Sequence, residues 1–477
     1  DAHGYCVAIG RDALKNQNAG ADAHNVAIGF SAGREVTTGT GNTVMGSYAG
    51  DALTTGTNNV AIGRSALSTE DAHGYNTAIG AYALLSQDAG ADAHNTAVGY
   101  STGQAITTGA YNTIIGAYTG DALTTGADNV AMGYAALSTE DAHGKNVAIG
   151  NYALQDQDAG ADAYNVAIGY NAGKEVTTGK ETVLIGGNAG LALTTGIRNV
   201  AVGHAALQTE DEHGYNVAVG NRALQNLNAG ADGYNVAVGS NAGQSVTTGI
   251  RNAIVGGLAG DAITTGSDNI AIGYAALSSS DTGSRTVAIG SYALEDQNPT
   301  GSDYFYNVAI GYTAGRDITT GTNNTIIGGL AGDSLTTGGR NIAIGYDALS
   351  TETGSDRSVA IGAEALKTQN VSSGNVYNVA IGDSAAENLT TGNLNTIIGG
   401  LAGDALTTGS NNVAIGYQAL TGEDAHGNNV AVGYMALQVL NAGNTGNNVA
   451  VGKEAGKVVS TGIKNTILGS KAGDLLE

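Results

Sequence analysis

The pentapeptide Asn25-Val26-Ala27-Ile28-Gly29 recurs, with conservative replacements, along the whole of this 477-residue chain. There are 27 copies, from Cys6–Gly10 to Asn465–Gly469, and their closing glycines mostly follow one another at steps of 17 or 19 residues. Four consecutive copies form a super-repeat of 70 residues. A fixed period of this length is typical of a solenoid, in which each repeat forms one coil and neighbouring coils share a core.

The pentapeptide has the pattern of a short β-strand. Its second residue is Val, Thr or Ile in every copy except the one with Ala253, its third is mostly Ala, and its fourth is Ile, Val, Met or Leu. Alternation with a period of two, rich in β-branched residues, predicts a strand. We therefore predict an all-β, parallel β-solenoid of about 27 coils. In each coil the strand is followed by a glycine corner, a short second strand and a polar turn such as Thr54-Thr55-Gly56.

Composition excludes several classes of protein. The chain has 76 Gly but one Pro, 42% hydrophobic residues and a net charge of −23. Collagen and disordered chains do not have this composition, and an acidic surface disfavours nucleic acid as a partner. No apolar run is long enough for membrane insertion. Because no shift in composition marks a boundary, we expect residues 1–477 to be a single domain without internal boundary, and a segment of a longer fibre.

The first residue of the pentapeptide is Asn in 23 of the 27 copies. In a stack of parallel, in-register coils these side chains lie one above another, about 4.8 Å apart. Stacked Asn side chains form hydrogen-bonded ladders in cross-β structures. We therefore predict a structural Asn ladder, whose first members are Asn25, Asn42, Asn59, Asn76, Asn95 and Asn112.

The two faces of the strand lead to a prediction about assembly. We expect the second and fourth residues to point into the coil and the third to point outward, although the third is apolar throughout. A strand that is apolar on both faces is usually covered on both. We therefore predict a chain–chain interface on the third residues, the alternative being a tolerated column of exposed alanines. The predicted interface residues are Ala27, Val44, Ala61, Ala78, Ile114, Leu184, Ile254, Ile326, Ile397 and Ile467.

Tandem pentapeptides such as Asn25–Gly29 and Asn59–Gly63 resemble the YadA-like head of trimeric autotransporter adhesins, a left-handed parallel β-roll. They are also similar to repeats in bacteriophage tail fibres. The resemblance implies a homotrimer on a cell or virion surface that attaches to a host receptor or surface glycan. The least repetitive coils, Gln297–Tyr306 and Thr368–Tyr377, are then the candidates for recognition.

The repeat itself leaves two alternatives open. One is a single-chain solenoid that polymerises end to end into an extracellular filament. The other is an ice-binding module that uses its Thr-Thr-Gly threonines, although these fall mainly in two of every four coils. Threonines confined mainly to two of every four coils do not form a continuous ladder, so a turn-forming role explains them better.

The residue pattern predicts no catalytic, cofactor-binding or metal-binding site. Every Ser and Thr belongs to a repeating column, whereas catalysis needs one asymmetric constellation. The column with His24 and His94 continues as Tyr164 and Tyr234, which indicates a packing aromatic and not a metal ligand. Calcium on the acidic loops is an open alternative, since Asp oxygens suit it, but the Gly-Gly-x-Gly-x-Asp repeat of calcium-binding β-rolls is absent from the sequence. Aspartates such as Asp71, in Asp-Ala-His, are interpreted as turn formers. We therefore expect a non-enzymatic structural protein.

Overall fold

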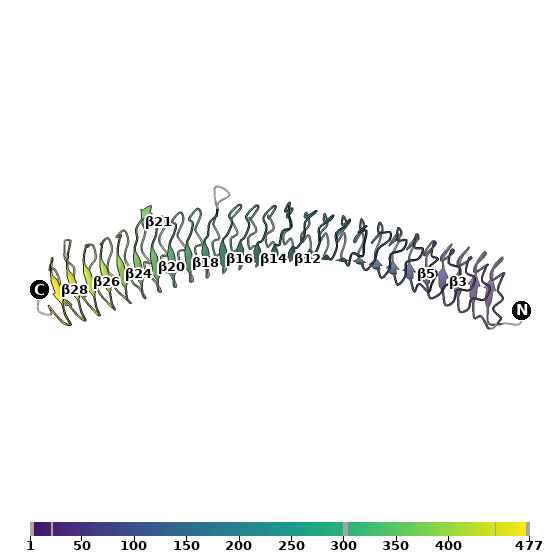
Figure 1. Ribbon diagram of the computed structural model, residues 1–477, viewed down its shortest axis with the longest axis horizontal. Helices are drawn as coiled ribbons and strands as arrows, with labels where there is room; N and C mark the ends of the chain where they lie inside the picture. Colours follow the sequence, from purple (N-terminus) through teal and green to yellow (C-terminus); the bar gives the residue numbers. More distant parts are fainter. Residues whose placement is uncertain (1–3, 21, 299–303, 444, 474–477) are drawn as a thin grey trace. The chain divides into compact units, whose positions relative to one another are not determined.

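The computed structural model describes residues 4–20, 22–298, 304–443 and 445–473, and it divides into two units, Asp1–Asn235 and Val236–Glu477. In each unit successive coils stack with their strands side by side (Figure 1). The described residues contain strands and turns but no helix, and so no helix that could cross a membrane. The all-β, parallel β-solenoid of about 27 coils is thereby confirmed. A single domain over residues 1–477 stays a prediction.

In the first unit one three-residue strand per coil pairs in parallel with the strand of the next coil. The strands are β1 (Val7–Ile9), β2 (Val26–Ile28), β3 (Thr43–Met45), β4 (Val60–Ile62), β5 (Thr77–Ile79), β6 (Thr96–Val98), β7 (Thr113–Ile115), β8 (Val130–Met132), β9 (Val147–Ile149), β10 (Val166–Ile168), β11 (Val183–Ile185), β12 (Val200–Val202) and β13 (Val217–Val219).

The second unit repeats this arrangement, with one extra pair of short strands, β21 and β23. Its strands are β14 (Val236–Val238), β15 (Ala253–Val255), β16 (Ile270–Ile272), β17 (Val287–Ile289), β18 (Val308–Ile310), β19 (Thr325–Ile327), β20 (Ile342–Ile344), β21 (Ser355–Asp356), β22 (Val359–Ile361), β23 (Gly374–Asn375), β24 (Val379–Ile381), β25 (Thr396–Ile398), β26 (Val413–Ile415), β27 (Val430–Val432), β28 (Val449–Val451) and β29 (Thr466–Leu468).

The register stacks equivalent residues of successive coils. Between β4 and β5, for example, Ala61 lies beside Ala78. The glycine after each strand turns the chain where the next coil passes very close. Gly63 has a φ of +134°, and a Cβ on it would lie 2.4 Å from the carbonyl oxygen of Gly80. No other residue fits such a corner.

The wall opposite the strands is built of turns, so the predicted second strand is absent from the described residues. These turns are nevertheless linked from coil to coil by backbone hydrogen bonds, such as Leu67 N–H to Ala83 O at 3.0 Å. Leu67 itself is fully buried with a φ of 51°. A left-handed conformation costs a non-glycine residue about 1–2 kcal/mol, whereas burying a leucine side chain contributes about 1.5–3 kcal/mol. Burial therefore offsets the backbone strain.

The same turn position holds Gly in other coils, and the core then fills differently. Gly50 also has a left-handed φ, of 49°, but it has no side chain to bury. The apolar residue three positions later, Leu53, occupies that space, because a Cβ on Gly50 would lie 2.8 Å from Leu53 Cδ1. In the next coil, where Leu67 fills the core, the residue three positions later is the buried Glu70. This core column therefore contains both apolar and polar residues.

The Asn column forms hydrogen bonds in both directions. The Oδ1 atom of each Asn accepts the backbone N–H of the Asn in the next coil, at 2.8–3.1 Å from Asn25 to Asn112. The Nδ2 atom usually donates to a backbone carbonyl 14 residues ahead, as Asn42 does to Gly56 at 2.8 Å. The side-chain amides thus bond to backbone groups and not mainly to one another. Asn76 departs from this pattern, since its Nδ2 has no hydrogen-bond partner.

Replacing Asn112 with Ala tests the contribution of this column. The change leaves the N–H of Asn129 and the carbonyl of Gly126 unpaired, and both now bond to the Asn112 side chain. An unsatisfied buried polar group costs about 1–3 kcal/mol. We expect a clearly lower urea midpoint by circular dichroism, whereas the exposed Asn221→Ala should change stability by less than about 0.5 kcal/mol. Equal midpoints would show that the Asn column does not stabilise the stack.

Candidate functional site

The outward face of each strand is apolar and partly exposed to solvent. In β4 the side chains of Val60 and Ile62 are partly exposed, whereas Ala61 between them is 0% exposed. The same alternation occurs in nearly every strand, and Met45, Ile79 and Ile272 are each more than a third exposed. We call the second and fourth residues of the pentapeptides, such as Val60 and Ile62, the outer face.

The predicted orientation of the strand residues is therefore wrong. The third residue of each pentapeptide points into the interior of its own coil. These third residues therefore do not form a chain–chain interface. The exposure of the ten predicted interface residues lies between 0% and 5% in a single chain: Ala27, Val44, Ala61, Ala78, Ile114, Leu184, Ile254, Ile326, Ile397 and Ile467. The third residue is small because the coil is narrow, and not because another chain approaches.

The bulky third residues fill space inside the coil. Ile114 lies beside Gly103 and Gly120, where a Cβ would come within 3.5 Å and 3.3 Å of Ile114 Cδ1. Leu184 lies in the same way between Gly173 and Gly190. These glycines stand at the turn position that other coils fill with Leu. A large strand residue therefore compensates for the missing leucines, which explains its return about every 70 residues.

The outer face carries no charge. None of the residues in the 27 stacked strands is ionisable, although the net charge of the chain is −23. The charged side chains lie in the corners and turns. Contiguous exposed apolar surface on a protein this acidic is the mark of an interaction surface. The outer face is thus the first candidate functional site.

A second exposed surface is a column of tyrosines just after the glycine corners in the first unit. Neighbouring rings meet edge to face, with centroids 5.4–6.2 Å apart. The column consists of Tyr82, Tyr100, Tyr118, Tyr134, Tyr152 and Tyr170. This column is not apparent in the sequence, because the tyrosines alternate between the first and second residues after the glycine.

The histidines fall into two environments. His94 is stacked between Tyr75 and Tyr111, with ring centroids 5.0 Å and 5.6 Å away, as expected for a packing aromatic. His73 instead faces the buried carboxylate of Glu70. No role for Glu70 is predicted from the sequence, although the motif Glu-Asp-x-His-Gly recurs at 70–74, 140–144, 210–214 and 423–427.

The Thr-Thr-Gly threonines take part in coil stacking. Thr37 Oγ1 donates to the carbonyl of Thr54 at 3.1 Å, and Thr54 Oγ1 donates to that of Asp71 at 2.8 Å. These hydroxyls therefore bond to the backbone of the next coil, 17 residues along the chain, and link neighbouring coils. The turn-forming role stays a prediction.

The two enlarged coils differ from the others. Residues 299–303 of the predicted recognition segment Gln297–Tyr306 lie outside the described residues. In Thr368–Tyr377 the chain adds strand β23, which pairs with β21 of the preceding coil. At least this enlarged coil is therefore integrated into the stack.

Comparison with known proteins assigns no family. No protein-family model matches the chain, and no curated protein matches it. Of the features that the resemblance to adhesin heads implies, the structure supports the parallel β-solenoid.

Adjacent isoleucines in β7 test the orientation of the strand residues. Ile114→Ala should lower the free energy of unfolding by about 2–5 kcal/mol, because it opens a cavity in the core. Ile115→Ala removes the same atoms from the outer face and should cost much less in the isolated chain. Urea midpoints measured at a concentration where the chain is monomeric provide the comparison. A larger loss for Ile115→Ala would reverse our assignment of inside and outside.

Proposed function

We propose that this chain is a non-enzymatic structural rod of an extracellular surface fibre or adhesin. We further propose that copies of the chain assemble through the outer face. The observation that carries this proposal is the uncharged, partly exposed row of mostly Val, Ile and Thr residues along every described strand of both units except short β21 and β23.

A second copy of the same chain fits this surface best. Burying apolar surface contributes about 25 cal/mol per Å², so a small gain in each coil adds up over many coils. Two copies also share the same coil spacing, which lets the side chains of one outer face match the gaps of another. Because the charged residues lie elsewhere, two acidic chains can approach along this face without placing like charges in contact.

The resemblance to trimeric adhesin heads favours three copies, arranged with their outer faces toward a common centre. Such a trimer on a cell or virion surface would hold an attachment site away from its base. The alternative, a single-chain solenoid that polymerises end to end, would leave the apolar outer face in contact with water along its whole length. The outer face therefore favours lateral assembly.

Attachment to a receptor or glycan requires a surface that stays exposed in the assembly. The tyrosine column is an extended aromatic surface of the single chain, in which Tyr100, Tyr134 and Tyr170 are 44–57% exposed, and in the proposed assembly it would stay exposed. Aromatic side chains with one polar end are enriched at binding surfaces. We include this column, with the enlarged coil Thr368–Tyr377, in the proposed attachment surface.

Charges placed on the outer face test the assembly. Val60, Val130 and Val200 occupy equivalent coils, and changing all three to Lys places charges in the proposed interface. We expect light scattering to give about three times 47.2 kDa for the unchanged chain and a single chain for the triple variant.

The matched control places the same three charges at the same 70-residue spacing on exposed turns, as Ala91→Lys, Ala161→Lys and Ala231→Lys. This variant should assemble like the unchanged chain. A monomeric unchanged chain, or the same loss of assembly in both variants, would contradict the proposed interface.

The tyrosine column is tested by changing Tyr100, Tyr134 and Tyr170 to Ala. On a glycan array, we expect binding by the assembled protein to weaken on the order of tenfold or more, because three exposed aromatic contacts are lost. The control changes Tyr75, Tyr164 and Tyr234, which are similarly exposed but stand directly before the Asn of the pentapeptide, at the position that His94 takes in its coil. Equal weakening by both sets would remove the column from the attachment surface.

A further inference from the structure

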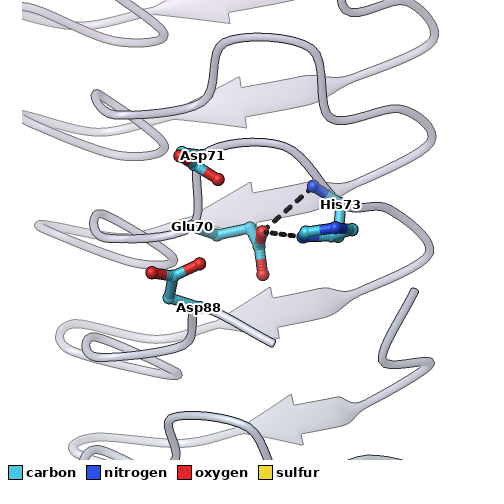
Figure 2. A group of neighbouring side chains, drawn as sticks. All are labelled: Glu70, Asp71, His73 and Asp88. Carbon is cyan, nitrogen blue, oxygen red and sulfur yellow. Dashed lines mark hydrogen bonds and ion pairs between the residues drawn. The ribbon is translucent and has the colours of Figure 1, made fainter. Parts of the chain in front are cut away.

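Two clusters of ionisable side chains lie 70 residues apart in the first unit. One comprises Glu70, Asp71, His73 and Asp88, and the other comprises Glu140, Asp141, His143 and Asp158. Within each cluster, one possible ligand atom from every residue lies within 4.8 Å of the others. Figure 2 shows the carboxylate of Glu70 facing the imidazole of His73, with the carboxylates of Asp71 and Asp88 on its other side.

The glutamate is buried because it belongs to the core column that other coils fill with Leu or Val. The side chain of Glu70 is 0% exposed. Its Oε1 atom accepts the backbone N–H of His73 at 3.0 Å and lies 3.3 Å from His73 Nδ1. Burial raises the pKa of the Glu70 carboxyl, and the N–H and charge of His73 oppose part of that rise.

Two buried atoms of each cluster have no hydrogen-bond partner. These are Oε2 of the glutamate and Nδ1 of the histidine, in both Glu70–His73 and Glu140–His143, although each Nδ1 also lies 3.3–3.5 Å from Oε1 of its glutamate as an ion-pair contact. The N–H of Ala89 is near enough to lower the pKa of Glu70, but it makes no hydrogen bond of normal geometry to Oε2. An unpaired buried polar atom costs about 1–3 kcal/mol, more when it is charged. Such atoms at one point are suited to an additional ligand.

The coil at Glu352 lacks the histidine and shows how the protein itself can satisfy the same glutamate. Glu352 Oε1 accepts the N–H groups of residues 353–355 at 2.9–3.0 Å. Its Oε2 accepts a hydrogen bond from Nε2 of Gln369, in the next coil, at 2.9 Å. The equivalent glutamine beside Glu70 is Gln87, whose Nε2 donates to the carbonyl of Thr107 instead. The unpaired oxygen is therefore not a necessary result of the fold.

The two remaining Glu-Asp-x-His-Gly coils have asparagine where the next coil supplies Asp88 or Asp158. These residues are Asn228 and Asn441. In these coils Oε2 accepts one long hydrogen bond, from the N–H of Ala229 to Glu210 at 3.3 Å and from that of Ala442 to Glu423 at 3.5 Å. The unpaired glutamate oxygen thus occurs in the two coils that also have the fourth acidic side chain.

We propose that the clusters Glu70–Asp71–His73–Asp88 and Glu140–Asp141–His143–Asp158 each bind one divalent transition-metal cation, with Zn²⁺ as the best match. Imidazole together with carboxylates suits such an ion, whereas Ca²⁺ prefers oxygen ligands alone. Ligands 2.0–2.1 Å from a tetrahedral zinc lie about 3.3–3.4 Å from one another. The Nδ1–Oε1 separations of 3.3 Å and 3.5 Å are close to that value.

The bound ion would link two neighbouring coils, since the glutamate and the second aspartate come from consecutive coils. The aspartates of both clusters are exposed, so the ion has access from solvent. The sequence analysis predicts no metal site, because the column with His24 and His94 continues as Tyr and Asp71 is interpreted as a turn former. The proposal differs from that prediction in these two coils.

The test measures Zn²⁺ binding to the full chain by isothermal titration calorimetry, together with the thermal unfolding midpoint. We expect two ions per chain and a higher midpoint with Zn²⁺, because the ion binds the folded state. The variant Asp88→Asn with Asp158→Asn reproduces the pattern of the Glu210 and Glu423 coils and keeps the fold, since both residues are exposed. It should bind Zn²⁺ on the order of tenfold or more weakly.

The matched control changes His213 and His426 to Asn, which removes histidines from the two coils outside the proposal. This control should still bind two Zn²⁺ ions. Absence of Zn²⁺ binding, equal affinity in the Asp88/Asp158 variant, or loss of binding in the control would overturn the proposal. Tighter binding of Ca²⁺ than of Zn²⁺ would overturn the assignment of the ion.

Discussion

The rest of the structure depends on the limited volume inside each coil. One strand and one wall of turns face each other across a space that a few side chains fill completely. Alanine at the third strand residue is therefore the ordinary choice, and a larger residue such as Ile114 occurs where neighbouring turns have Gly in place of Leu. Protein interiors tolerate neither voids nor overpacking. The 70-residue super-repeat is thus a pattern of complementary volumes.

Hydrogen bonds hold these coils in one register. The Asn side chains bond to backbone groups of their own and neighbouring coils, while the glycine corners let successive backbones approach closely. Most buried polar groups of the stack are hydrogen-bonded within it. The second and fourth residues of the pentapeptides lie outside the core. They are free to meet a partner, which is why we propose that copies of the chain assemble through the outer face.

The polar members of the core column show how a structural repeat can acquire chemistry. When Leu67 occupies the turn position, the residue three places later no longer has to fill the core, and Glu70 can stand there. A buried carboxylate then needs a partner. Gln369 is the partner for Glu352, whereas His73 and the nearby aspartates surround Glu70 and leave one oxygen unpaired. Small differences between otherwise equal coils therefore distinguish a satisfied glutamate from a proposed cation site.

The sequence by itself determined the coil number, the register and the Asn column, because in-register stacking converts a repeat directly into columns of like residues. It did not determine which strand face is inside. Val60 and Ala61 are both apolar, so period-two alternation distinguishes two faces without identifying the core. Only the tertiary structure decided this, since the narrow interior admits Ala61 and leaves Val60 outside. It likewise brought Glu70 and Asp88 together, because they lie in consecutive coils and a linear motif records only neighbours along the chain.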